Sequence, residues 1–203
     1  MIVALISGRG SNLQALLEAG LPVSGVISNR AEAKGLATAA ARGIATRVVE
    51  HRQFAGREAF DAALAEQIDA FRPRLVVLAG FMRVLTRSFV TRYEGRLLNI
   101  HPSLLPAFPG LDTHARALAE GVKLHGCTVH FVTAELDHGP IVIQAAVPVR
   151  QDDTAETLAA RVLRQEHAIY PRAARWFLEG KLVIESGVVR VKGNDAQLVL
   201  APD

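Results

Sequence analysis

Five short and almost purely apolar runs in the first half of the sequence constrain the fold most strongly. They are rich in Val, Ile and Leu, and they cover residues 2–6, 23–28, 46–49, 75–79 and 97–100. Runs of this length with little polar alternation are typical of parallel strands whose two faces are both covered. They predict a buried, mostly parallel β-sheet.

Helical patterns separate these runs. Ser11 and Gln14 have the spacing of a capping box, and Gly20 predicts the end of that helix. Apolar residues recur at helical spacing from Phe60 to Phe71, and Pro73 closes the segment. Alternating strands and helices predict an α/β fold with a doubly wound, mostly parallel, Rossmann-like sheet.

The pattern changes after Pro102, where antiparallel strands and a long helix are expected. The turn sequence Asp137-His-Gly-Pro140 joins two of these strands, so we expect an antiparallel C-terminal extension. The expected elements are a proline-bounded loop at 104–109, a short helix at 114–120, strands at 127–132 and 141–149, a long helix capped within 152–154, and one or two peripheral strands within 181–200.

Composition excludes several classes of protein. No apolar run approaches the roughly 20 residues that span a bilayer, and the first run lacks the basic lead-in of a signal peptide. The single cysteine, Cys127, rules out an internal disulfide and argues against a cysteine-based metal site. A net charge of +3 with scattered Lys and Arg argues against a nucleic-acid surface. We therefore expect a cytoplasmic protein without a membrane partner.

Three strand ends carry the residues best suited to chemistry. In an open α/β sheet, ligands bind beyond the carboxyl ends of the strands. The segments at these ends are Ser7-Gly-Arg-Gly-Ser-Asn12, Gly80-Phe-Met-Arg83 and Asn99-Ile-His-Pro102. The first precedes a helix and suits a phosphate, although it is neither a Walker loop nor a full dinucleotide fingerprint, and a plain tight turn explains its glycines equally well.

Asn99 and His101 are the strongest candidates for catalysis. Residues two apart on a strand project to the same side, so the amide and the imidazole are expected to point together. A structural histidine and a simple turn aspartate at Asp137 remain alternatives. The other histidines do not share a metal-ligand spacing, and His130 and Cys127 are expected to be packing residues.

Several of these motifs together resemble a known family. The runs Asn99-Ile-His-Pro-Ser-Leu-Leu-Pro106, Phe108-Pro-Gly110 and Asp137-His-Gly-Pro140 resemble the signature of formyltransferases that use 10-formyltetrahydrofolate. The 7–12 loop and Gln165-Glu-His-Ala-Ile-Tyr-Pro171 are similar to the branch that formylates glycinamide ribonucleotide (GAR) in purine synthesis. The resemblance covers residues 1–180.

The resemblance implies a role for each matching residue. Asn99, His101 and Asp137 would be catalytic, orienting the formyl group, stabilising the oxyanion and moving protons. GAR would contact Gly10, Ser11, Asn12 and Glu166. The folate would contact Arg57, Met82, Arg83, Val84, Leu85, Asn99, Thr133, Ala134, Glu135, Leu136 and Asp137.

It further implies a single domain over residues 1–203, with a nucleotide-binding half at 1–100 and a folate and catalytic half at 101–203. The implied substrates are GAR and 10-formyltetrahydrofolate as co-substrate, with no metal, and the enzyme would be a monomer or homodimer. Ala134 and His138 depart from the usual pattern. Leu163 replaces a polar residue near the phosphate, for which Arg161 or Arg164 would compensate.

Three rival functions stay open at this level. Methionyl-tRNA formylation usually requires an additional C-terminal domain, for which this chain has no room. Formyltetrahydrofolate hydrolysis usually comes with an extra N-terminal domain, whereas the first strand here begins at Ile2. A non-catalytic nucleotide- or folate-binding module is the third, because a fold does not fix a function. The joint presence of Asn99, His101 and Asp137 argues against it.

Overall fold

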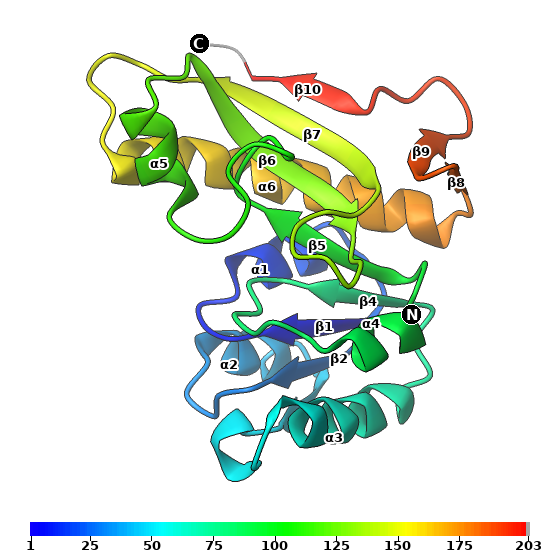
Figure 1. The fold of residues 1–203 in the computed structure, drawn as a ribbon. Coiled ribbons are helices and arrows are strands. Elements are labelled where there is room, and N and C mark those ends of the chain that lie inside the picture. The colour runs from blue at the N-terminus through cyan, green and yellow to red at the C-terminus, as the bar shows by residue number, and fades with distance from the viewer. Residues whose placement is uncertain (202–203) are drawn as a thin grey trace. The chain divides into compact units, whose positions relative to one another are not determined.

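The computed structural model describes residues 1–201, and the chain forms two compact units, Met1–Asn99 and Ile100–Asp203 (Figure 1). Figure 1 colours the first unit from blue to green and the second from green to red. Within the described part of the chain, no helix is both long and apolar enough to cross a membrane.

The first unit is built on a parallel sheet with strand order β3-β2-β1-β4-β5. The last two residues of β5, Ile100 and His101, belong to the second unit. The order reverses between β1 and β4, which is the topological switch of a doubly wound sheet. The predicted parallel sheet is confirmed, and each strand ends within one residue of its expected bounds. The strands are β1 (Ile2–Ile6), β2 (Val23–Ser28), β3 (Ala45–Val48), β4 (Leu75–Leu78) and β5 (Leu97–His101).

Five helical segments connect these strands, and one prediction about them is wrong. The N-cap of α1 is Gly10 at φ 77°, so Ser11 is already the first helical residue and forms no capping box. The side chain of Gln14 donates instead to Glu18, at 2.7 Å. A Cβ on Gly10 would lie 2.8 Å from the Cα of Gly35, so glycine is required there. The segments are α1 (Ser11–Glu18), α2 (Lys34–Ala40), η1 (His51–Gln53), α3 (Arg57–Asp69) and α4 (Arg87–Arg92).

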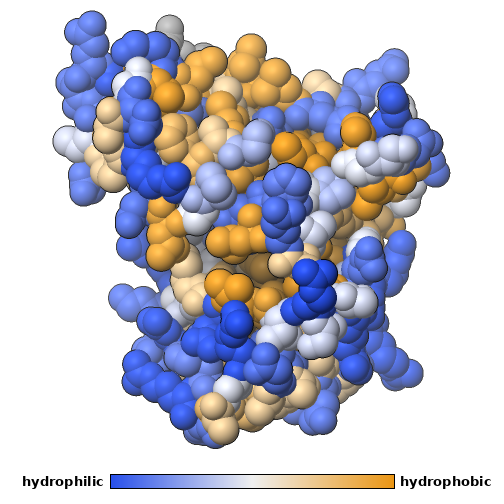
Figure 2. Space-filling view, viewed as in Figure 1, coloured by the Kyte–Doolittle hydropathy of each residue, from blue (hydrophilic) through white to orange (hydrophobic). Residues whose placement is uncertain are grey.

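The second unit contains the expected antiparallel strands. β6 (Leu124–Phe131) and β7 (Ile141–Pro148) pair antiparallel, and β10 (Leu198–Leu200) adds to β7 in parallel. β8 (Leu182–Glu185) and β9 (Val188–Val191) form a separate hairpin. Residues 181–200 therefore contain three strands, whereas the sequence predicted one or two. Apolar side chains of β6 and β10 stay exposed, among them Leu124, Leu198 and Leu200. Figure 2 shows hydrophobic patches on one face of the molecule.

Two helices complete the second unit. α5 (Thr113–Ala119) is short, and α6 (Ala155–Leu178) packs against β6 and β7. Thr154 caps α6 through a reciprocal pair of hydrogen bonds with Thr157, which confirms the predicted start of this helix. The fold class is therefore confirmed as a mostly parallel α/β sheet with an antiparallel extension.

Candidate active site

The glycine loop of the first unit lies between β1 and α1. The backbone N–H of Gly35 donates to the carbonyl of Gly8 at 3.1 Å, which fixes the loop against α2. Gly10, Ser11 and Asn12 follow in sequence into the first turn of α1, and Asn12 is buried. A helix N-terminus reached through a glycine is a favourable environment for an anion. The three residues predicted to bind phosphate are thus contiguous at this helix start.

The 82–85 segment follows β4 and leaves two large apolar side chains in solvent. Met82 is 66% exposed and Val84 is 54% exposed. The guanidinium of Arg83 lies over the ring of Phe60, 5.4 Å from its centroid. Exposed apolar side chains at the carboxyl end of a sheet strand suit a flat, largely apolar ligand such as a pterin ring. Arg57 is exposed at the start of α3.

His101 and Asp137 meet in the second unit, as the resemblance implies. The Nδ1 atom of His101 lies 3.5 Å from Oδ2 of Asp137, and both side chains are buried, with 7% and 9% exposed. The Nε2 atom of His101 lies 3.0 Å from the carbonyl oxygen of Phe108. The N–H of Gly110 donates to Oδ2 of Asp137 at 2.8 Å. Both ring nitrogens therefore face oxygen acceptors, an arrangement in which both can act as donors.

Phe108 and Gly110 were not assigned a role from the sequence, although both lie in the Phe-Pro-Gly motif. They contact His101 and Asp137 through backbone atoms, and every residue type has such atoms, so the sequence carries no signal for these contacts. Phe108 has φ 53° and Gly110 has φ 79°, so the segment follows a tight left-handed path. Asn99 is half-buried on β5, two residues before His101.

The 133–137 loop is closed by its own hydrogen bonds. The hydroxyl of Thr133 donates to the carbonyl of His138 at 2.9 Å. Ala134, Glu135 and Leu136 are exposed, and Leu136 is a further apolar side chain in solvent. A Cβ on Gly139 would lie 1.7 Å from the carbonyl oxygen of Phe131, so only glycine fits after this loop.

His125, His130 and Cys127 of the second unit are buried, and His114 is half-buried. Nε2 of His125 lies 3.2 Å from Nδ1 of His114. Burial lowers the pKa of His125 to about 4, with repulsion from His114 as the next cause, and burial also lowers the pKa of His114 and of His130. Burial raises the pKa of the Cys127 thiol. A buried, protonated thiol is a packing group, as predicted for Cys127.

Arg161, one of the two residues expected to compensate for Leu163, is engaged by Asp153. Its guanidinium makes two hydrogen bonds to the carboxylate of Asp153, at 2.7 and 2.8 Å, and a third to the carbonyl of Pro148. The pair is buried, and Arg161 holds the pKa of the Asp153 carboxyl well below its usual range. Arg164 is exposed on α6, so it is the remaining candidate.

Glu166 is buried on α6, with 7% of the residue exposed. Among residues 1–201, no group of three or more His, Cys, Asp or Glu side chains is placed to hold a metal ion.

A histidine held between a carboxylate and a carbonyl at the end of a buried strand is typical of α/β enzymes that use acid–base chemistry. The formyl transferase family model matches residues 1–174, and the chain belongs to this family.

Named relatives agree with this membership. The chain is 50% identical over 199 residues to phosphoribosylglycinamide formyltransferase of Escherichia coli (strain K12), covering 95% of this chain and 94% of that protein. It is 46% identical over 199 residues to the trifunctional purine biosynthetic protein adenosine-3 of Bos taurus, covering 95% of this chain but only 19% of that protein. The structure of glycinamide ribonucleotide transformylase 1 from Symbiobacterium toebii matches with a TM-score of 0.91 and 52% identity, over 94% of this chain and 92% of that one.

Proposed function

We propose that this chain transfers the formyl group of 10-formyltetrahydrofolate to the amine of GAR, giving formyl-GAR and tetrahydrofolate in de novo purine synthesis. The observation that carries the proposal is the buried His101–Asp137 pair, 3.5 Å apart, at the end of β5. The chain's 50% identity to a phosphoribosylglycinamide formyltransferase also supports the proposal.

The proposal gives each candidate residue a task. Gly10, Ser11 and Asn12 bind the phosphate of GAR, and Glu166 binds GAR through its carboxylate. The exposed apolar side chains of Met82 and Val84 suit a pterin ring, which favours folate as the formyl carrier. The residues proposed to bind folate are Arg57, Met82, Arg83, Val84, Leu85, Asn99, Thr133, Ala134, Glu135, Leu136 and Asp137.

The reaction makes three demands on the protein. When the substrate amine attacks the formyl carbon, an oxyanion develops, the amine must lose a proton, and the departing folate nitrogen must gain one. The amide of Asn99 donates to the oxyanion without titrating. His101 donates a second hydrogen bond, with charge if it is protonated, and its Nε2–H exchanges the carbonyl of Phe108 for the formyl oxygen. Asp137 holds the imidazole in place and assists proton transfer.

The chain's own residues supply this chemistry, and the proposal requires no metal. We propose that residues 1–100 form a nucleotide-binding half and that residues 101–203 form a folate and catalytic half. The working enzyme would be a monomer or homodimer in the cytoplasm, with two small-molecule substrates and no nucleic-acid partner.

The test is spectrophotometric consumption of 10-formyltetrahydrofolate by wild type and His101→Ala, each with and without GAR. Consumption that needs GAR and collapses in the variant supports the proposal. Consumption by wild type without GAR contradicts it and indicates a hydrolase. Binding of both substrates without turnover contradicts it and indicates a non-catalytic module.

A further inference from the structure

A short chain of hydrogen bonds crosses the carboxyl ends of three strands within the first unit. The hydroxyl of Ser7, directly after β1, lies 2.6 Å from Oδ1 of Asn29, directly after β2. The backbone N–H of Met82, which follows β4, donates to the Ser7 hydroxyl oxygen at 2.8 Å. Ser7 is 5% exposed and Asn29 is 2% exposed. Two buried polar side chains thus connect the interior of the sheet to the 82–85 segment.

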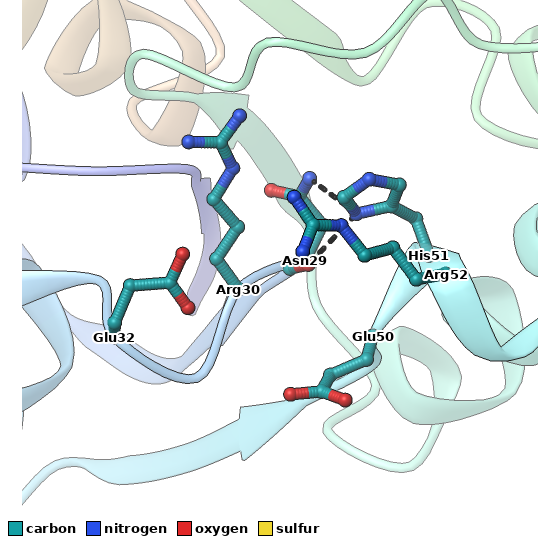
Figure 3. A pocket seen from close by; sticks show the side chains of 6 residues that line it. All are labelled: Asn29, Arg30, Glu32, Glu50, His51 and Arg52. Atoms are coloured by element: carbon teal, nitrogen blue, oxygen red, sulfur yellow. Dashed lines mark hydrogen bonds between the residues drawn. The ribbon is translucent and has the colours of Figure 1, made fainter.

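The N–H of Met82 fixes the donor and acceptor roles in this series of hydrogen bonds. Because the N–H of Met82 donates to Ser7, the hydroxyl proton of Ser7 goes to Oδ1 of Asn29. The amide nitrogen of Asn29 then points away from Ser7, towards Nδ1 of His51 at 3.2 Å. Figure 3 shows Asn29 and His51 facing each other in a surface pocket. The other residues lining this pocket are Arg30, Glu32, Glu50 and Arg52.

We propose that the Ser7–Asn29 pair is a positioning element that fixes the backbone of Met82 and, through it, the 82–85 segment for folate. This inference rests on the proposed function, in which that segment binds the pterin. The segment lies between β4 and α4, and its exposed Met82 and Val84 side chains hold it only weakly by packing. Its far end is anchored where Asp61 accepts from the N–H of Thr86, at 2.6 Å. Ser7 supplies the anchor at the near end.

A segment anchored at both ends loses less conformational entropy when a ligand binds. Loss of the anchor at Ser7 should therefore weaken the binding of folate. Ser7→Ala removes the hydroxyl that both Met82 and Asn29 use. One such hydrogen bond corresponds to a factor of about two to ten. We expect KM for 10-formyltetrahydrofolate to rise by that factor, with kcat and KM for GAR within about twofold of wild type.

Ser24→Ala is a matched control in the same pair of strands. The Ser24 hydroxyl donates to the carbonyl of Ile2 at 3.2 Å, at the opposite end of β1. Its loss should leave KM for 10-formyltetrahydrofolate unchanged, and melting temperatures of all variants show whether they fold. Equal rises in both KM values, or the same folate effect in Ser24→Ala, would mean a general structural role and would overturn the inference.

A double-mutant cycle tests whether Ser7 and Asn29 act as one unit. Asn29→Ala leaves the hydrogen bond from Met82 to Ser7 but frees the serine rotamer, so its effect should be smaller than that of Ser7→Ala. The double variant should be no worse than Ser7→Ala alone, because coupled residues are not additive. Additive effects would overturn the inference. If Ser7→Ala does not fold, KM for 10-formyltetrahydrofolate is compared between Asn29→Ala and Ser24→Ala. A rise in Asn29→Ala alone supports the inference, and equal values overturn it.

A binding measurement separates this inference from the proposed function. The dissociation constant of 5-formyltetrahydrofolate, a stable formyl folate, is measured by calorimetry without GAR. If wild type binds this probe but does not formylate GAR, the proposed acceptor is wrong, and a weaker dissociation constant in Ser7→Ala still supports the positioning role. An unchanged dissociation constant in Ser7→Ala, or no binding by wild type, overturns the inference.

Discussion

Replacing His125 by glutamine should make the second unit less sensitive to acid. His125 is 1% exposed, and its ring lies edge-on to those of His114 and Phe108. Burial lowers its pKa from 6.5 to about 4 in the folded chain. The folded pKa lies below the unfolded one, so the unfolded state binds the proton more tightly. Stability is therefore complete above about pH 6.5 and falls as the pH drops towards about 4.

The size of this effect follows from the two pKa values. The pKa is about 6.5 in the unfolded chain and about 4 in the folded chain, so protonation of His125 lowers the free energy of unfolding by about 2–3 kcal/mol between about pH 7.5 and about pH 4.5. His114 lies 3.2 Å away and its pKa is also lowered by burial, so it adds to the acid sensitivity of wild type.

The assay is urea unfolding at both pH values, followed by tryptophan fluorescence. Trp176 is the single tryptophan and is buried on α6, so the signal reports on the unit that contains His125. The free energy of unfolding of His125→Gln should fall by about 2–3 kcal/mol less than that of wild type over this interval. His138→Gln is the control, because the His138 side chain is 70% exposed. A His125→Gln variant that loses as much stability as wild type would refute the reasoning.

Two further predictions concern the residues at and beside the 133–137 loop. Asp137→Asn removes the carboxylate charge beside His101, the proposed catalytic histidine, and should lower kcat by about 10²–10³ in the formyl-transfer assay; full turnover would contradict the proposed role of Asp137. Gly139→Ala places a Cβ where 1.7 Å separates it from the carbonyl oxygen of Phe131, and should lower the melting temperature by about 5–10 °C in a calorimetric scan. Gly56→Ala, whose Cβ meets its nearest atom at 3.6 Å, is the control, and equal melting temperatures for the two variants would contradict the steric argument.

The strands β1 and β4 were the most directly predictable. All residues of β1 and of β4 are buried, so their sequences carry an uninterrupted apolar signal. The short helices α2 and α4 were not anticipated, since seven and six residues are too few for apolar positions to recur. The start of α1 was misplaced by one residue because the left-handed conformation of Gly10, and not the serine pattern, decides where the helix begins.

In the site, local sequence patterns predicted some positions, but contacts between residues distant in the sequence could not be predicted from such patterns. Strand alternation places Asn99 and His101 without reference to the rest of the chain. The approach of Asp137 to His101 depends on how the chain returns through β6 and was expected only through the family resemblance. The engagement of Arg161 by Asp153 was not anticipated, because nothing in the sequence distinguishes a guanidinium that binds phosphate from one that anchors a helix.

The fate of the formyl carbon tests the central claim most directly. 10-Formyltetrahydrofolate carrying an isotopically labelled formyl carbon is incubated with the chain and GAR, and the products are followed by carbon NMR. The account predicts that the label appears as the formamide carbon of formyl-GAR, at a rate that falls with His101→Ala. Label that appears as free formate, or that stays on the folate, would contradict it.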